Sequence, residues 1–409
     1  MKLYDELVAR GLIKDISSED LIDKLNNESL TFYLGTDPTA DSLHIGHYST
    51  FLTAKRLQKA GHKPILLVGA ATGLVGDPRG TGEREKADYD TIMNNYEKLS
   101  KQVENVFGIK AVNNYDWFRD YKYIDFLRDY GKYINVNYMI NKELVKRQME
   151  VGISYAEFSY MLIQGVDFKY LHENYGVNLQ IGGSDQWGNL TTGIELTRKL
   201  CGDEVYAFSM PLVTDSKGKK FGKSEGNAIW LDINKTSSYE LYQYLINLED
   251  VMMDDYLKRF TFLTLDEIDE IVKKHNEKPE ERYAQKILAR EIITDIHRED
   301  EYKKAVNISE SLFSGDYTRL SEDELLVAFK GIKSFEINND LNIVDMLVDN
   351  KICSSKREAR EIISGNAISI NNNKVNDCEY IISKDDTLFN KYIILKKGKK
   401  NRYLVVCNY

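Results

Sequence analysis

The hydrophobic positions of the first 230 or so residues fall into short continuous runs separated by amphipathic stretches. Two apolar runs, SLTFYLG at 29–35 and PILLVGA at 64–70, enter glycine-bearing turns and predict buried strands. A third strand–turn–helix junction, NLQIGGSDQWGN, lies around residue 183. Strands that alternate with helices predict an α/β fold with a parallel sheet, whose ligands bind where strand ends meet helix starts.

Capping signals mark the helices between and after these strands. Residues 42–61 have a helical period, and Asp41 or Ser42 is the expected N-cap. From about residue 234 the chain becomes a series of helices. Two of them begin with capping boxes, at Ser237 and at Thr264, each followed three positions later by glutamate.

The last third of the chain predicts more helices and then a small α+β unit. Pro279 suits the first turn of a helix that runs to residue 297. A polar stretch at 336–342 predicts a linker. A short helix at 343–349, a helix with a Ser355 capping box and two strands around Asn371–Asn373 follow. These elements predict a compact terminal unit.

The charge is unevenly distributed along the chain. The net charge is −9, and 42% of the residues are hydrophobic, which is ordinary for a globular protein. Residues 351–409 carry 12 Lys and Arg against 6 Asp and Glu, whereas the rest of the chain carries 43 against 58. A basic terminal unit on an acidic body is expected where one small domain contacts a polyanion, although a solvated surface also explains the charge.

Cysteine usage and the start of the chain bear on its location. The four cysteines lie far apart without a C-x-x-C pair, which argues against disulfides and zinc and fits a reducing cytoplasm. The amphipathic, acidic start MKLYDELVARGL shows no secretory signal, and no apolar run is long enough to span a membrane. We therefore expect a cytoplasmic protein without a membrane segment.

The stretch LHIGHY at 43–48 places two histidines three positions apart at a helix start. A zinc pair would need further ligands, and none shows paired spacing, so no metal site is expected. Core packing and anion handling both remain open from the residues alone. Anion handling is favoured by the free amides at a helix start, and Gly46 would let a ligand approach the backbone between His44 and His47.

Three further stretches carry candidate chemistry. KGKKFGKSEGN at 217–227 has closely spaced lysines, which indicate either a solvated loop or a cation pair for a leaving pyrophosphate. The glycine-rich loop at 69–84 matches neither common phosphate-binding fingerprint, but its Asp77 suits a cation or an ammonium group. EFSYMLIQGVDF at 157–168 places three polar residues on one helix face, which form either mutual pairs or a pocket wall.

Together, HIGH at 44–47, KFGKS at 220–224 and QIGGSDQWGN at 180–189 resemble the motifs of class I aminoacyl-tRNA synthetases. With FYLGTDPTADSLHIGH and NNYDW at 113–117, the resemblance is to the bacterial tyrosyl branch, and the terminal unit is similar to a small RNA-binding domain. It implies a Rossmann-like catalytic domain at 1–232, an α-helical anticodon-binding-type domain at 233–330, a linker at 331–341 and a basic RNA-binding domain at 342–409.

The resemblance also implies roles for individual residues. Phosphate contacts and catalysis would come from Thr39, His44, His47, Lys220 and Lys223. The substrate tyrosine would be held by Tyr33 and Asp167 at its hydroxyl, by Asp77, Tyr160 and Gln164 at its ammonium, and by Gln186 and Asp37. Contacts to ATP would come from Gly35, Gly46, Thr50, Asp185, Ser224 and Arg84. Independently of the resemblance, Lys356, Arg357 and Arg360 cluster on one side of a predicted helix, and Lys396 to Arg402 form a second basic stretch, so both are expected to contact the tRNA.

The implied reaction is tyrosine–tRNA ligation, with L-tyrosine, Mg·ATP and tRNA(Tyr) as substrates, no tightly bound prosthetic group, and a homodimeric enzyme. The motif KFGKS departs from the KMSKS of the wider class, although both lysines remain. Thr81–Gly82 stand where some members carry lysine, and Leu34 stands where some carry cysteine. Two alternatives are an adenylating nucleotidyltransferase that uses no RNA, and an inactive RNA-binding relative.

Overall fold

The computed structural model describes residues 1–77, 88–224, 227–398 and 401–408, apart from the side chains of Glu143, Leu144, Lys223, Ser224 and Asn227. The chain forms two compact units. The first consists of Met1–Thr236 and Tyr244–Ile296, and the second of Ser237–Gln243 and His297–Tyr409. Among the described residues, no helix combines the length and apolar character that a membrane crossing requires.

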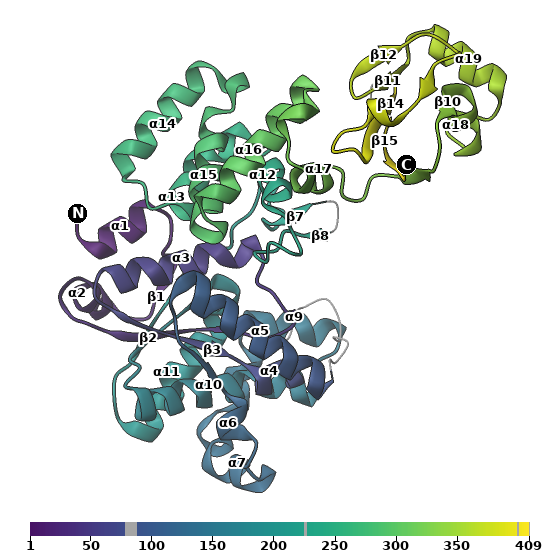
Figure 1. The fold of residues 1–409 in the computed structure, drawn as a ribbon. Coiled ribbons are helices and arrows are strands. Elements are labelled where there is room, and N and C mark those ends of the chain that lie inside the picture. The colour runs from purple at the N-terminus through teal and green to yellow at the C-terminus, as the bar shows by residue number, and fades with distance from the viewer. Residues whose placement is uncertain (78–87, 225–226, 399–400, 409) are drawn as a thin grey trace. The chain divides into compact units, whose positions relative to one another are not determined.

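The first unit is built on a six-stranded sheet with the order β1-β6-β5-β2-β3-β4. Strands β2 and β3 are neighbours in this sheet (Figure 1). All neighbouring strands are parallel except β1 and β6. The strands are β1 (Asp15–Ile16), β2 (Thr31–Thr36), β3 (Lys63–Val68), β4 (Ala111–Asn113), β5 (Leu179–Gly183) and β6 (Tyr206–Met210). The predicted α/β fold with a parallel sheet is confirmed, and the two predicted apolar runs are β2 and β3.

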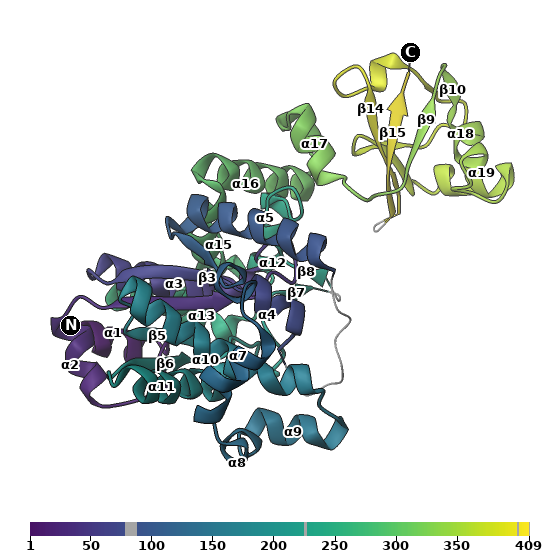
Figure 2. The ribbon, with the colours of Figure 1, turned by 90° about the horizontal axis from the view of Figure 1, so that it is seen from below.

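Helices cover both faces of this sheet, which explains why its strands are apolar throughout. On β2, Tyr33 packs with Phe168 of α10 and with Leu67 of β3. Phe32 and Leu34, on the opposite face because side chains alternate along a strand, are also buried. Helix α11 packs against β5 and β6, and α3 against β3 (Figure 2).

The helices of the first 201 residues are α1 (Leu3–Ala9), α2 (Asp20–Asn27), α3 (Ile45–Lys59), α4 (Ala70–Val75), α5 (Tyr89–Phe107), α6 (Tyr115–Phe118), α7 (Tyr123–Asp129), α8 (Val136–Ile140), α9 (Glu143–Val151), α10 (Tyr155–Tyr175) and α11 (Trp187–Cys201). A short hairpin, β7 (Lys223–Ser224) and β8 (Asn227–Ala228), precedes α12 (Ser238–Ile246), α13 (Met253–Phe260), α14 (Leu265–Glu277) and α15 (Tyr283–His297). The capping boxes at Ser237 and Thr264 are confirmed. Pro279 opens a separate 3-10 turn rather than α15, because Arg282 has a left-handed φ of 54° that interrupts the helix.

The second unit contains helices on both faces of a smaller sheet with the order β12-β11-β14-β15-β9. Its helices are α16 (Glu299–Ser314), α17 (Glu322–Ala328), α18 (Ile343–Asp349) and α19 (Lys356–Ser364). Its strands are β9 (Ser334–Ile337), β10 (Leu341–Asn342), β11 (Ile368–Ile370), β12 (Asn373–Val375), β13 (Ile381–Ile382), β14 (Tyr392–Lys397) and β15 (Asn401–Cys407). Strand β9 lies in the segment predicted to be a linker and pairs in parallel with β15.

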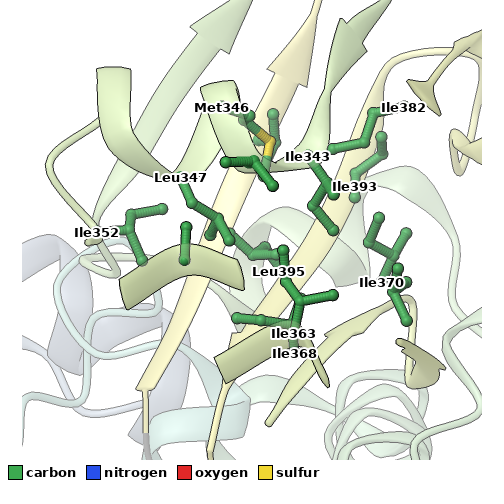
Figure 3. Close-up of a cluster of buried hydrophobic side chains, with 14 of the residues drawn as sticks. Ile343, Met346, Leu347, Ile352, Ile363, Ile368, Ile370, Ile382, Ile393 and Leu395 are labelled. Atoms are coloured by element: carbon green, nitrogen blue, oxygen red, sulfur yellow. The ribbon is translucent and has the colours of Figure 1, made fainter. Parts of the chain in front are cut away.

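Strand β14 contributes to two separate hydrophobic cores. Ile393 and Leu395 face α18 and α19, where isoleucines and leucines of helices and strands converge (Figure 3). Tyr392 and Ile394 belong to a second core, which includes Ile308 of α16 and residues of α17. The alternation along β14 therefore joins the small sheet to α16 and α17 within one unit.

Candidate active site

Three parallel strands of the first unit end near one another at their carboxyl termini. Asp37 follows β2, Gly69 and α4 follow β3, and Ser184 follows β5. Because β2 lies between β3 and β5 in the sheet, these three segments form one edge. This is the place where parallel α/β sheets bind ligands.

The residues 43–47, here called the histidine turn, form the start of α3. His44 is the N-cap, and its Nδ1 accepts a hydrogen bond from the Gly46 amide at 3.1 Å. In the reciprocal contact, His47 Nδ1 accepts a hydrogen bond from the His44 amide at 3.3 Å. The expectation of Asp41 or Ser42 as N-cap is wrong, since Asp41 pairs with lysines and the Ser42 hydroxyl donates to the Leu43 carbonyl.

This capping arrangement defines the protonation of the two rings. An Nδ1 that accepts a hydrogen bond carries no proton, so we assign the proton of each neutral ring to Nε2. Burial, together with the neighbouring His44, lowers the pKa of His47 to about 3. The two rings stack with centroids 3.8 Å apart. The turn therefore presents neutral N–H donors, which suit phosphate oxygens.

The segment that contains Lys220 packs directly on the histidine turn. A side chain on Gly46 would lie 2.8 Å from the His44 ring and 3.2 Å from the Phe221 carbonyl oxygen. Gly222, with a φ of +89°, would bring a side chain to 2.6 Å from Ile45. Gly46 is thus required by contact between the two motifs, a reason that differs from the ligand approach expected from the sequence.

Aromatic packing and backbone pairing hold this segment in place. Phe221, at the position of methionine in KMSKS, is buried against Tyr256 and Phe260 with ring centroids 4.8 and 4.9 Å away. The Ile45 amide donates to the Ile229 carbonyl at 2.8 Å. Lys220 Nζ lies 4.0 Å from Asp185 Oδ2, so the segment also approaches the end of β5.

Some predicted residues cannot be placed. Arg84 and the departure Thr81–Gly82 lie outside the described residues, and the side chains of Lys223 and Ser224 are not described. A pocket of about 490 Å³ borders the histidine turn. It is lined by Thr36, Asp37, Thr39, Ala40, Ser42, Leu43, His44, His47, Leu99 and Trp230.

A second group of polar residues, here called the carboxylate cluster, contains Tyr33, Asp37, Asp77, Tyr160, Gln164 and Asp167. Asp167 is 1% exposed and accepts hydrogen bonds from Asn114 Nδ2 at 3.2 Å and Trp117 Nε1 at 3.0 Å. Burial raises the pKa of Asp167 well above its usual range, against the lowering effect of these two donors. Tyr33 is fully buried, and burial and Asp167 raise the pKa of its hydroxyl.

The other end of the carboxylate cluster is also rich in acceptors. Tyr160 donates to Asp37 Oδ2 at 3.0 Å, and Gln186 donates to Asp77 Oδ2 at 2.9 Å. Burial, with smaller contributions from Asp37 and Asp185, raises the pKa of Asp77 to about 7. The predicted single face of Tyr160, Gln164 and Asp167 is present on α10, where all three lie within 155–175.

Three atoms of the carboxylate cluster are buried yet have no hydrogen-bond partner among the described residues. They are the Tyr33 hydroxyl, Asp77 Oδ1 and Gln164 Oε1. A buried polar group without a partner costs about 1–3 kcal/mol. A concentration of such groups is suited to a ligand that carries a hydroxyl at one end and an ammonium at the other.

Comparisons with known proteins agree with this geometry. The family model "tRNA synthetases class I (W and Y)" matches residues 25–314, and the "Tyrosine--tRNA ligase SYY-like C-terminal domain" matches residues 324–405. Tyrosine–tRNA ligases of Streptococcus agalactiae serotype V and Streptococcus thermophilus are each 48% identical over 416 residues and 99% of this chain, and are matched over 99% and 100% of their own lengths. The chain belongs to the tyrosine–tRNA ligases of class I.

A solved structure of this family has the same fold. The C-terminally truncated mitochondrial tyrosyl-tRNA synthetase of Aspergillus nidulans matches with a TM-score of 0.70 and 32% identity, over 76% of this chain and 94% of its own. The family assignment covers both units of the chain, since the two family models together span most of its length.

Relative to the ligase family motifs, the structure adds residues that the sequence did not assign. Asn114 and Trp117 hold Asp167, Thr72 donates to Asp37 Oδ1 at 2.7 Å, and Asn189 donates to Gln186 Oε1 at 2.7 Å. Asn114 and Trp117 lie in the NNYDW motif, which was a signal of resemblance without assigned roles. Both residues donate to Asp167, which lies 50 or more positions away along the chain, so no local pattern could assign them this role.

Several other predicted residues belong to neither group. Thr50 is half-buried on α3, and Gly35 is exposed at the end of β2. Leu34 is buried in the core on the face opposite Tyr33. The predicted tRNA contacts Lys356, Arg357 and Arg360 belong to the second unit, where they are exposed on α19. In the described part of the chain, no group of three His, Cys, Asp or Glu side chains is placed to hold a metal ion.

Proposed function

We propose that this protein activates L-tyrosine with Mg·ATP and transfers it to tRNA(Tyr). The observation that carries the proposal is the buried pair of Tyr33 and Asp167, which lies beside the same sheet edge as the histidine turn. A substrate tyrosine hydroxyl between these two side chains would satisfy the Tyr33 hydroxyl, which has no hydrogen-bond partner in the described part of the chain. Phenylalanine, which lacks the hydroxyl, would leave that group unpaired. A site with buried polar groups of this kind therefore selects tyrosine over phenylalanine.

In the first step, an oxygen of the tyrosine carboxylate attacks the α-phosphorus of ATP. The bond from that phosphorus to the bridging oxygen breaks, and pyrophosphate leaves with the electron pair. No proton is transferred, so the site needs no general base. Neutral His44 and His47 donate to phosphate oxygens, and Lys220 and Lys223 balance the charge that develops on pyrophosphate.

The ammonium of tyrosine binds to the other end of the carboxylate cluster. Asp77 and Gln164 each have a buried acceptor atom that no described residue contacts by a hydrogen bond, and Tyr160 supplies a third contact. Together they fix the substrate so that its carboxylate faces the phosphates. Positioning of this kind accounts for a large part of the rate enhancement when no covalent catalysis is available.

In the second step, a ribose hydroxyl at the 3′ end of tRNA attacks the carbonyl carbon of tyrosyl-adenylate. The bond from that carbon to the phosphate oxygen breaks, AMP leaves with the electron pair, and the hydroxyl proton passes to a phosphate oxygen of the leaving AMP. Lys356, Arg357 and Arg360 contact the RNA backbone from the second unit. We place the reaction in the cytoplasm.

The decisive experiment is amino-acid-dependent exchange of pyrophosphate into ATP. Exchange that requires tyrosine supports the proposal. Exchange that requires tryptophan, or that needs no amino acid, contradicts it, and the second outcome favours the nucleotidyltransferase alternative. Absence of exchange favours an inactive RNA-binding relative.

We also propose that the enzyme is a homodimer through helices α7 to α10. Large apolar side chains of these helices are at least 50% exposed, namely Tyr123, Ile124, Val136, Met149, Val151 and Tyr155. Exposed large apolar side chains that gather in one part of the chain are a feature of subunit contacts. Changing Ile124 and Val136 to aspartate is expected to yield monomers in light scattering, and an unchanged mass would contradict the proposal.

A further inference from the structure

The carboxylate of Asp41 connects three segments that lie far apart in the sequence. Lys235 Nζ lies 2.5 Å from Asp41 Oδ1, and Lys98 Nζ lies 3.1 Å from Oδ2. Asp41 stands three positions before His44, Lys98 belongs to α5, and Lys235 follows the KFGKS segment. Hydrogen bonding to Lys235 lowers the pKa of Asp41, with a smaller lowering from Lys98, so Asp41 is a carboxylate at neutral pH.

Lys235 makes a second contact toward the histidine turn. Its Nζ lies 5.3 Å from the centre of the Trp230 ring, within the range of a cation–π interaction. Trp230 in turn meets His44 edge to face, with ring centroids 6.3 Å apart, and lines the pocket beside it. Lys235 therefore contacts both the residue that precedes the turn and the ring that touches its first histidine.

The backbone between these contacts is paired with the turn as well. The Leu231 amide donates to the Leu43 carbonyl at 2.8 Å, and together with the Ile45–Ile229 hydrogen bond it flanks an antiparallel bridge between His44 and Trp230. From α5, Gln102 Oε1 accepts from the Leu43 amide at 2.8 Å. The turn is thus held by α5 on one side and by residues 229–235 on the other, and Lys235 is the charged contact of the second side.

We propose that Lys235 is a positioning residue for adenylate formation, which through Asp41 and Trp230 holds the segment after KFGKS against the histidine turn. The inference rests on the proposed function. Lys235 is 33% exposed and Asp41 25%, and an ion pair of this exposure contributes little to folding stability. Its effect is on the distance between the lysines and the histidines, on which the rate depends.

Lys24 offers a matched control in the same unit. It is 30% exposed, pairs with Glu28 at 3.1 Å and lies 5.6 Å from the centre of the Tyr206 ring, so it combines the same two kinds of contact on α2. Lys235→Ala is expected to lower kcat of tyrosine-dependent exchange about tenfold, while the KM for tyrosine changes by less than about twofold. Lys24→Ala is expected to leave both constants unchanged.

Further variants separate positioning from a loss of structure. Lys235→Arg keeps the charge and the aromatic contact and is expected to retain at least about half of the rate. Asp41→Asn, which also loses the Lys98 contact, is expected to lower kcat at least as much as Lys235→Ala. The Asp41→Asn/Lys235→Ala double variant is expected to match Asp41→Asn, because the contact between the two side chains is already lost. The melting temperature of each should stay within a few degrees of the unmodified protein.

Two results would overturn the role of Lys235. One is equal loss in Lys24→Ala and Lys235→Ala, and the other is a double variant whose loss is the product of the two single losses. Absence of tyrosine-dependent exchange in the unmodified protein would instead overturn the proposed function. The two failures are therefore distinguishable in the same assay.

Discussion

The carboxylate cluster and the histidine turn lie beside the same sheet edge but are built in opposite ways. In the carboxylate cluster, buried acceptors and a buried hydroxyl have no partner among the described residues. In the histidine turn, the backbone amides at the helix start are already capped by the two rings. The first is arranged to be completed by a small polar molecule, whereas the second is complete in itself.

This difference matches the two kinds of substrate group. A tyrosine side chain must be recognised against close analogues, which requires buried groups that only the right ligand satisfies. A triphosphate needs donors in fixed positions, because its charge moves during the reaction. Internal caps provide such fixed positions without a ligand. The following experiments act on this contrast, beginning with the largest expected effect.

Changing Asp167 to Ala should lower kcat/KM for tyrosine in exchange by several hundredfold, about 3 kcal/mol or more. The change removes the hydroxyl contact and leaves the Trp117 indole N–H without its acceptor, while Asn114 Nδ2 keeps Thr72 Oγ1 as an acceptor. The KM for ATP should change by less than about twofold. Steady-state exchange at varied tyrosine and varied ATP measures both constants. Asp254→Ala, which removes an exposed carboxylate paired with Lys258, is the control, and an unaltered tyrosine response in the Asp167 variant would reject its role.

Changing His44 to Ala should lower kcat about a hundredfold with little change in the KM for tyrosine, because a fixed donor to the phosphates is lost. The variant also loses a helix cap, so Thr264→Ala, which removes a cap on α14, is the matched control. That control should lose about 1 kcal/mol of stability but no activity. If both variants lose only stability, the turn serves folding and not catalysis.

The rate should depend on pH through Asp77, whose pKa is raised to about 7. A protonated carboxyl cannot pair with an ammonium, so kcat/KM for tyrosine should fall about tenfold per unit as the pH drops below 7. The Asp77→Asn variant should have a lower kcat/KM for tyrosine, and its pH profile should lack the inflection near pH 7. A wild-type profile that is flat from pH 5 to 8 would contradict the assignment.

The raised pKa of Asp77 also predicts how the stability of the fold depends on pH. Between the ordinary pKa of 3.8 and about 7, the folded state holds a proton on Asp77 that the unfolded state releases. The stability that this protonation gives the folded state is therefore present at low pH and is lost as the pH rises to 7. Asp77→Asn should therefore raise the melting temperature at pH 8 while it lowers activity.

The smallest effect concerns the second unit. Replacing Lys356, Arg357 and Arg360 by glutamine should weaken tRNA charging about fivefold and reduce its salt dependence, with exchange unchanged. If the variant charges tRNA as well as the unmodified protein at every salt concentration, α19 does not contact the RNA. Truncation at Asn342 is expected to spare adenylate formation and abolish charging, but it also strips the core around Ile308 and Leu325, so the substitution is the cleaner test.

The site was predictable from the sequence where local chemistry decides, and not where distant contacts do. The Tyr160, Gln164 and Asp167 face follows from helical spacing alone. The partners of Asp167 do not, because Asn114 and Trp117 approach it only when β4 and α10 are both in place. The N-cap of α3 was misjudged for the same reason, since Asp41 is engaged by Lys98 and Lys235.

The sequence by itself determined most of the elements, because hydrophobic period and capping residues act within a few positions of the chain. It also determined the residue types of the site, because the HIGH, QIGGSDQWGN and KFGKS motifs follow one another in this order along the chain. Only the tertiary structure decided that Gly46 is needed for contact with Phe221, that β9 joins the small sheet, and which buried acceptors have no partner among the residues that the structure describes. Those features depend on pairs of segments that meet through packing, and no local pattern encodes which segments meet.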